Sequence, residues 1–253
     1  MLASVLGSTP VLQAFADSST HMIHHSSPML RVRESTSTNW SGYAAESSIT
    51  SPTSRFVNQV VGTWTVPTVN CAVTPVGYSS VWVGIDGYSD STVEQLGTEQ
   101  DCSSGSPVYY AWFEMYPHPG YYITQTLVHP GDSITASVTY NGGKIFTLTM
   151  KDVRGSTTVF TFSKSFFANA QRSSAEWVVE APYYQGILPL ADYGSVNFSS
   201  SEYRNSASGT ALQPVNAHGY DPINMQDPSG GSSTTSGLSA TGTSFTTTWL
   251  PYP

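Results

Sequence analysis

Charged side chains are scarce in this sequence. Asp, Glu, Lys and Arg make up 10% of its 253 residues, where about a quarter is usual for soluble proteins. Nine Lys and Arg against 17 Asp and Glu give a formal net charge of −8 and an isoelectric point of about 5.0. So acidic a chain argues against nucleic acid or an anionic membrane surface as its partner.

The same shortage bears on acid tolerance. Acid unfolds proteins mainly by protonating carboxylates that ion pairs keep ionised in the folded state. With nine basic residues the chain can form few such pairs, so we expect it to tolerate acid and to be secreted. A Ser- and Thr-rich extracellular domain without acid tolerance would have a similar composition.

Long apolar runs, amphipathic helices and cysteines are also few. No apolar run is long enough to span a membrane, and no segment has the period of an amphipathic helix. The two cysteines, Cys71 and Cys102, suit one disulfide in an oxidising compartment, although two separate buried thiols would give the same pattern. Two cysteines without clustered histidines argue against a zinc site.

The N-terminal part of the chain differs from the rest. "VLQAFADSS" has the small-x-small pattern of a signal-peptidase site, so residues 1–16 are interpreted as a signal-peptide remnant cleaved after Ala16. Residues 17–36 hold three of the six histidines and two of the nine basic residues, without a strand period. They are interpreted as a propeptide or a flexible tail. Residues 37–253 then form a single domain.

That domain reads as short β-strands separated by turns. "YNGGK" at 140–144 is a hairpin turn, and residues 205–242 are expected to be loop-rich surface with some edge strand. Many short strands with close turn signals predict an all-β sandwich of two antiparallel sheets. The predicted strands lie in "RFVNQVVGTWTVP", "SSVWVGIDG", "STVEQLGTEQ", "VYYAWFEMYP", "DSITASVTY", "IFTLTMKDV", "TVFTFSKSF", "SAEWVVEA", "GSVNFSS" and "SFTTTWL".

Carboxylates and aromatic residues share strand faces in four of these runs. In "SAEWVVE", alternation places Glu176 and Glu180 on one face and Trp177 on the other. One face of each sheet must be apolar to form the core, and the opposite face here suits a ligand groove. Cross-strand aromatic pairs with stray surface acids are the alternative for any one residue. The other residues on the polar faces are Trp82, Asp86, Gln95, Trp112, Glu114 and Tyr116.

A glutamate and a glutamine can together hydrolyse a peptide bond in acid. Hydrolysis needs a base for the water, a donor for the oxyanion and a proton for the leaving amine. Imidazole is protonated in acid, whereas a carboxylate with a pKa near the working pH can accept and return the proton. A glutamine amide donates to the oxyanion at any pH.

Four blocks carry a family resemblance. "NWSGYA", "WVGIDG", "YYAWFEMYP" and "SAEWVVE", in this order, resemble the glutamic endopeptidases (eqolisins), which are secreted acid proteases. The resemblance implies a sandwich with its active site on the concave face, a Glu/Gln dyad, insensitivity to pepstatin, and no metal or other cofactor. It also implies protein or peptide substrates.

By motif, the resemblance assigns the catalytic roles to Glu180 and Gln95. The stretch around Gln95 departs from the family pattern, so Gln100 is a weaker rival for the glutamine. Glu176 is expected to be a supporting acid. The expected substrate-binding residues are Trp40, Trp82, Asp86, Trp112, Glu114, Tyr116 and Glu176.

Two other functions compete with proteolysis. A glycosidase on a similar sandwich would pair Glu180 with Glu114 or Glu176, and a carbohydrate-binding module would stack sugars on Trp82, Trp112 and Tyr116. The predicted strands contain no spaced His/Asp/Ser set, which argues against a serine hydrolase.

We also hypothesise that residues 17–36 inhibit the enzyme as a zymogen segment. Arg31 and Arg33 would bind the acidic groove at neutral pH and leave when its carboxylates protonate. We expect the protein to be a monomer.

Overall fold

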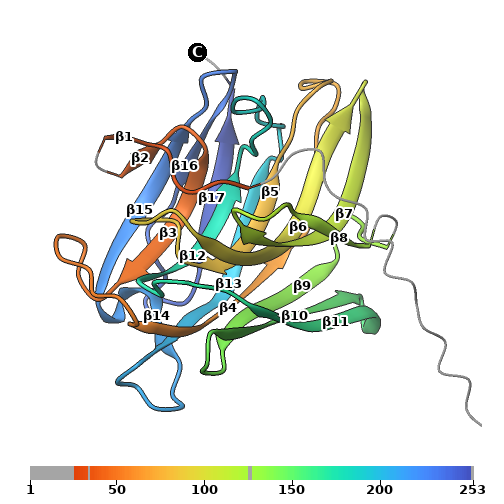
Figure 1. Ribbon diagram of the computed structural model, residues 1–253. Coiled ribbons are helices and arrows are strands. Elements are labelled where there is room, and N and C mark those ends of the chain that lie inside the picture. The colour runs from red at the N-terminus through yellow and green to blue at the C-terminus, as the bar shows by residue number, and fades with distance from the viewer. Residues whose placement is uncertain (1–25, 34, 125–126, 252–253) are drawn as a thin grey trace, which may run out of the picture.

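The computed structural model of the chain describes residues 26–33, 35–124 and 127–251 (Figure 1). All neighbouring strands of its first sheet are antiparallel, as the short alternating runs predict. In spatial order the first sheet contains β15 (Gly219–Gln226), β3 (Trp40–Glu46), β12 (Ser174–Glu180), β5 (Ser80–Ile85), β6 (Val93–Ser103), β7 (Ser106–Tyr116) and β8 (Tyr121–Thr124).

The second sheet lies against the first. It contains, in spatial order, β16 (Ser232–Thr235), β17 (Phe245–Leu250), β13 (Ser195–Asn205), β4 (Val57–Thr65), β9 (Ser133–Tyr140), β10 (Ile145–Arg154) and β11 (Thr157–Phe167). The short elements are β1 (Arg31–Arg33), β2 (Thr36–Ser37), β14 (Gln213–Pro214) and the 3-10 helix η1 (Val215–Ala217). Strand β15 joins the sheets, because it pairs with β3 on one side and with β16 and β2 further along.

The main core fills the space between the two sheets. It is formed by the apolar faces of the strands, among them Val81, Val83 and Ile85 of β5. Two tryptophans also tie the layers together by hydrogen bonds: Trp64 Nε1 donates to Thr98 Oγ1 at 3.0 Å, and Trp177 Nε1 donates to the Val61 carbonyl at 2.7 Å. Burying each indole therefore leaves no unpaired N–H at these two positions. The predicted all-β sandwich is confirmed.

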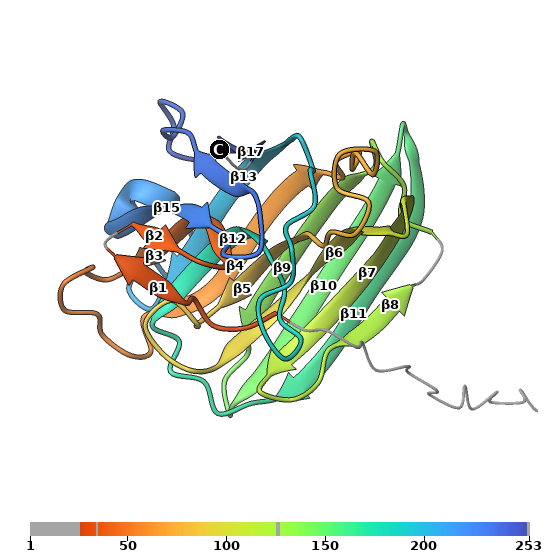
Figure 2. The ribbon, with the colours of Figure 1, turned by 90° about the horizontal axis from the view of Figure 1, so that it is seen from above.

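A second, smaller core covers the outer face of the first sheet. Trp40, Trp82, Trp112 and Val178 belong to it, and all four come from strands β3, β5, β7 and β12. The short strands β1 and β2 lie over this face beside β3 and β15 (Figure 2). The outer face is therefore buried where the polar residues lie, rather than open to solvent.

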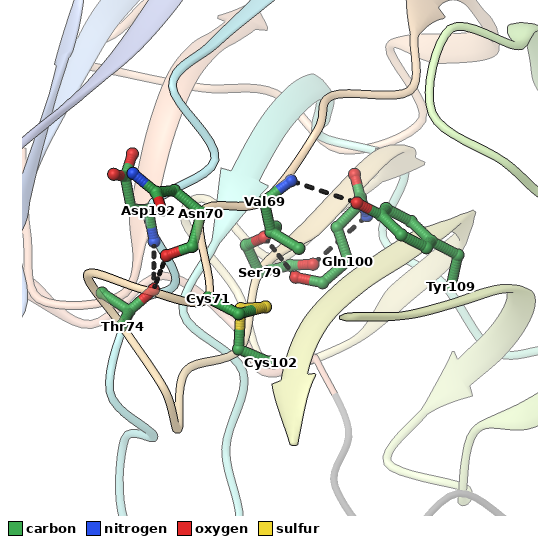
Figure 3. The surroundings of a disulfide bond; sticks show 9 residues. All are labelled: Val69, Asn70, Cys71, Thr74, Ser79, Gln100, Cys102, Tyr109 and Asp192. Carbon is green, nitrogen blue, oxygen red and sulfur yellow. Dashed lines mark hydrogen bonds between the residues drawn. A yellow bond between two sulfur atoms is a disulfide. The ribbon is translucent and has the colours of Figure 1, made fainter. Parts of the chain in front are cut away.

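The disulfide is formed between Cys71 and Cys102, as one of the two sequence interpretations expected. Their Cα atoms are 5.3 Å apart, and the bond ties the loop between β4 and β5 to the end of β6 (Figure 3). Hydrogen bonds from Val69 N to Tyr109 Oη and from Asp192 N to Thr74 Oγ1 surround it. The bond therefore anchors a long loop at the edge of the sandwich.

Two segments form strands whose partners lie far along the chain. Residues 205–242 contain loops and, as expected, edge strand, since β15 pairs with β3 at the edge of the first sheet. Part of the 17–36 segment is packed against the domain as β1 and β2. Strand β15 supplies the backbone partners of β2, and no strand period in the local sequence predicts this pairing. The interpreted signal remnant, residues 1–16, lies outside the described residues.

Candidate active site

The polar residues of the outer face form rows across the first sheet. One row joins Glu180 of β12 to Ser80 of β5 and Glu99 of β6. A second row, four residues along, joins Glu176 to Gly84, Gln95 and Glu114. Directly opposed residues of an antiparallel pair point to the same side of the sheet. Glu180 and Gln95 therefore lie on one face, which the proposed dyad requires.

The Glu180 carboxyl is fully buried and surrounded by donors. Its Oε1 accepts from Ser27 N at 2.9 Å and Asn39 Nδ2 at 3.3 Å, and its Oε2 accepts from Trp82 Nε1 at 2.9 Å. Burial raises the pKa of Glu180 to about 8, although these hydrogen bonds act in the opposite direction. The carboxyl is therefore protonated in this form of the protein below neutral pH.

The Gln95 amide is held by a neighbouring acid. Its Nε2 donates to Glu114 Oε2 at 3.0 Å, and both side chains are buried. Burial, followed by the charge of Glu180, raises the pKa of Glu114 well above its ordinary value. Glu114 is thus close enough to Glu180 for their charges to interact while it orients Gln95.

Gln100 lies on the other face of β6. Alternation from Gln95 places Gln100 with Leu96 and Thr98 on the side that faces the second sheet. Its Nε2 donates to the Ser79 carbonyl at 3.2 Å (Figure 3). Of the two glutamines, Gln95 alone shares a face with Glu180.

Trp82 lies between the two proposed dyad residues. Its Nε1 binds Glu180, while a Cβ added at Gly84 would lie 2.8 Å from its Cζ3 atom and 3.2 Å from Gln95 Cβ. Glycine at position 84 therefore allows the indole to lie flat across β5, with one end at Glu180 and the other beside Gln95.

The other expected aromatic residues share this surface. Trp40 packs edge-on against Trp82 with ring centroids 4.9 Å apart, and its Nε1 donates to the Ser27 carbonyl at 3.0 Å. Trp112 is 1% exposed, and its buried Nε1 has no partner among the described residues. Tyr116, half-buried, lies near Glu114 and Glu180, whose charges help burial to raise its pKa. The site thus has a tryptophan donor without a hydrogen-bond partner in the described part of the chain.

Two expected groove residues lie away from Glu180. Asp86 follows β5 with a φ of 74°, and its carboxylate accepts from Arg172 N and Ser173 N, both at 2.7 Å. Asp86 therefore links the β5–β6 connection to the residues that precede β12 by hydrogen bonds. Glu176 is fully buried with both oxygens unpartnered among the described residues, and burial raises its pKa well above normal.

The segment before β1 lies directly on the site. Besides the Ser27 contacts, Asn39 Nδ2 donates to the Pro28 carbonyl at 3.3 Å, and Met29 N donates to the Gly87 carbonyl at 3.0 Å. Ser26, Ser27 and Met29 are buried. Arg31 lies further on, with Nη1 3.9 Å from Asp221 and its guanidinium 4.6 Å from the Tyr88 ring centroid. The side chain of Arg33 lies outside the described residues.

Sequence reasoning missed three neighbours of Glu180. Asn39 and Ser27 donate to its carboxyl, and the buried Glu99, in the same row, has its pKa raised well above normal by burial and then by Asp101, with a smaller effect from Glu180. Asn39 adjoins Trp40 in a block already singled out, so its position was a usable signal. No local pattern linked Ser27 to a strand 153 residues away.

Several solved structures share this fold. Scytalido-glutamic peptidase, solved with a peptide-based transition state analogue, superposes with a TM-score of 0.65 and 21% identity, covering 84% of this chain and 98% of that one. SCP-B, an eqolisin bound to the tripeptide Ala-Ile-His, gives 0.60 and 22%, covering 84% and 98%. Aspergilloglutamic peptidase from Aspergillus niger gives 0.54 and 24%, covering 69% and 99%. The fold thus defines the class as the glutamic-peptidase sandwich.

Sequence comparison identifies the family. The chain belongs to the Peptidase A4 family, whose model matches residues 38–249. It is 30% identical over 143 residues to Aspergillopepsin-2 of Aspergillus niger, covering 55% of this chain and 50% of that protein. The chain therefore spans about half the length of this curated relative. The predicted resemblance to glutamic endopeptidases is confirmed.

Proposed function

We propose that this glutamic peptidase is a secreted acid endopeptidase in which Glu180 and Gln95 form the catalytic dyad. One observation carries the proposal: a buried carboxyl and a buried amide lie on the same outer face of one sheet, with the Trp82 indole between them. Family membership supports peptide substrates.

The chemistry follows from the positions of these groups. The Glu180 carboxylate removes a proton from a water molecule, whose oxygen attacks the peptide carbonyl carbon. Gln95 donates one N–H of its amide to the oxyanion that forms. The other N–H of the same amide donates to Glu114, which holds the amide in place. Glu180 then gives the proton to the amide nitrogen as the C–N bond breaks. The carboxyl ends the cycle as it began, as a carboxylate.

Acid activity requires Glu180 to be ionised in acid, which the covered form prevents. Burial is the largest cause of its raised pKa, so removing the segment around Ser27 exposes the carboxyl to water and lowers the pKa toward normal. Trp82 and Asn39 remain as donors that stabilise the carboxylate. The uncovered enzyme therefore has its base available at acid pH.

The covering segment supports a zymogen role for residues 17–36. The segment of residues 26–30 lies against Glu180 through Ser27, so a substrate peptide reaches Glu180 only after this segment leaves. Arg31 contributes through Asp221 and Tyr88. Mass spectrometry of the N-terminus during a shift from pH 7 to pH 4 tests this: trimming beyond Ser27 should accompany the rise in activity. An unchanged N-terminus in a fully active protein would exclude the zymogen role.

Secretion and a monomeric state complete the proposal. The Cys71–Cys102 disulfide suits an oxidising compartment. Among residues 26–33, 35–124 and 127–251, no helix is long and apolar enough to cross a membrane. Secretion is tested by finding the protein in the culture medium of its source, and the monomeric state by light scattering.

The decisive experiment compares wild type with Glu180→Gln in digestion of denatured protein between pH 2 and pH 7, with and without pepstatin. We expect pepstatin-insensitive activity in wild type and a loss of at least about a thousandfold in Glu180→Gln. Glu202→Gln, on β13 of the other sheet, is the matched control and should retain activity. A folded and active Glu180→Gln protein, or cleavage of polysaccharides instead of protein, would refute the proposal.

A further inference from the structure

Three of the nine basic residues of this acidic chain line one cavity, and neither dyad residue lines it. The cavity has a volume of about 490 Å³ and lies where the β9–β10 turn meets the segment between β11 and β12. Arg55, Lys144 and Arg172 line it, and no Asp or Glu does. In a protein with 17 acidic residues, such a separation of charge is unexpected for ordinary surface.

None of the three cationic side chains forms an ion pair with a carboxylate within the part of the chain that the structure describes. The nearby charge of Asp86 acts on Arg172, but Asp86 does not line the cavity. Like charges gathered around a concave surface repel each other and raise the local positive potential. An anion in the cavity would relieve that repulsion.

Arg172 is the buried member of the three cations. Its side chain is 8% exposed, and its guanidinium lies 3.8 Å from the Tyr140 ring centroid. Nη1 donates to the Val57 carbonyl at 3.3 Å and to Asn58 Oδ1. The stacked, planar guanidinium keeps further N–H groups in a fixed orientation, which suits two-point binding of a phosphate or sulfate group.

The backbone fixes the three cations relative to one another. Arg55 N donates to the Gln171 carbonyl at 2.7 Å, Phe56 N donates to the Arg172 carbonyl at 2.9 Å, and Ala168 N donates to the Lys144 carbonyl at 3.0 Å. All three cations have left-handed backbones, with φ of 62°, 65° and 56° for residues 55, 144 and 172. Such conformations cost energy outside glycine and gather at functional sites.

From this arrangement we infer a binding site for a phosphate-type oxyanion, formed by Arg55, Lys144 and Arg172 and separate from the peptidase centre. The cavity volume exceeds that of a single phosphate ion, so a condensed phosphate should bind more tightly than inorganic phosphate. Both ligands share the tetrahedral oxyanion that the guanidiniums recognise.

Isothermal titration of the full chain with inorganic phosphate and with tripolyphosphate, at constant ionic strength set with chloride, tests the inference. We expect saturable binding of one tripolyphosphate per chain, and weaker binding of phosphate. Arg55→Gln and Lys144→Gln should each weaken tripolyphosphate binding by about tenfold. Both side chains are exposed, so these variants should fold.

Lys151→Gln is the matched control, because Lys151 is exposed on β10 but does not line the cavity. It should bind tripolyphosphate as wild type does. Amide NMR shifts confined to the 140–144 and 168–172 segments would place the ligand. The inference is overturned if neither anion binds saturably, or if Lys151→Gln weakens binding as much as Lys144→Gln does.

Discussion

Replacing Glu180 by glutamine should change how stability depends on pH. Burial raises the pKa of Glu180 from 4.5 to about 8, so between these values the folded protein binds a proton that the unfolded chain has released. Stability attributable to this group is therefore highest below pH 4.5 and falls as the pH rises toward 8. The slope is at most about 1.4 kcal/mol per pH unit, which gives at most about 3 kcal/mol between pH 5 and pH 7.

The assay is urea unfolding of Gln95→Ala and Gln95→Ala/Glu180→Gln at pH 5 and pH 7. The shared Gln95→Ala background slows self-digestion by about 10²–10³, so the segment over the site stays in place during the measurement. Glutamine keeps the shape of the protonated carboxyl and cannot ionise, and any fixed difference in hydrogen bonding appears equally at both pH values. The double variant should lose less stability on going to pH 7, by up to about 3 kcal/mol. Parallel losses in the two proteins would refute the reasoning.

Three further predictions concern the dyad, its tryptophan and the disulfide. Gln95→Ala should lower kcat by about 10²–10³, whereas Gln100→Ala, on the opposite face, should keep the dyad intact; equal losses in single-turnover assays would contradict the assignment. Trp82→Phe removes a donor to the Glu180 carboxylate and should raise the pKa of the acid limb of the kcat/KM profile by about one unit. An unchanged pKa of that limb would count against this role of Trp82. Replacing Cys71 and Cys102 by serine opens a cross-link over 31 positions and should cost about 3–4 kcal/mol, measured by urea unfolding, where an unchanged midpoint would disprove the estimate.

Strand positions were predictable because alternation is a local property. The runs around Val81, Phe113 and Trp177 each have one apolar face, and those faces form the core between the sheets. The same alternation placed Glu180 and Gln95 opposite the core. Ranking Glu180 above Glu176 required the family resemblance, since both share one strand face.

The covering of the site was decided by tertiary structure. Ser27 reaches Glu180 across 153 residues, and strand β2 forms because β15 offers it a parallel edge. Neither contact leaves a period or motif in the sequence. Likewise, the contact of Asp86 with Arg172 and Ser173 depends on a distant loop that supplies two N–H donors.

The chain alone thus determined its strands, their apolar faces and the acids and amide left on the polar side, because these follow from side chains a few residues apart. Only the folded protein decided which polar groups meet, which are covered, and how burial changes their pKa. Those properties depend on neighbours brought together from strands distant in sequence, where hydrogen bonds and loss of water act on each carboxyl.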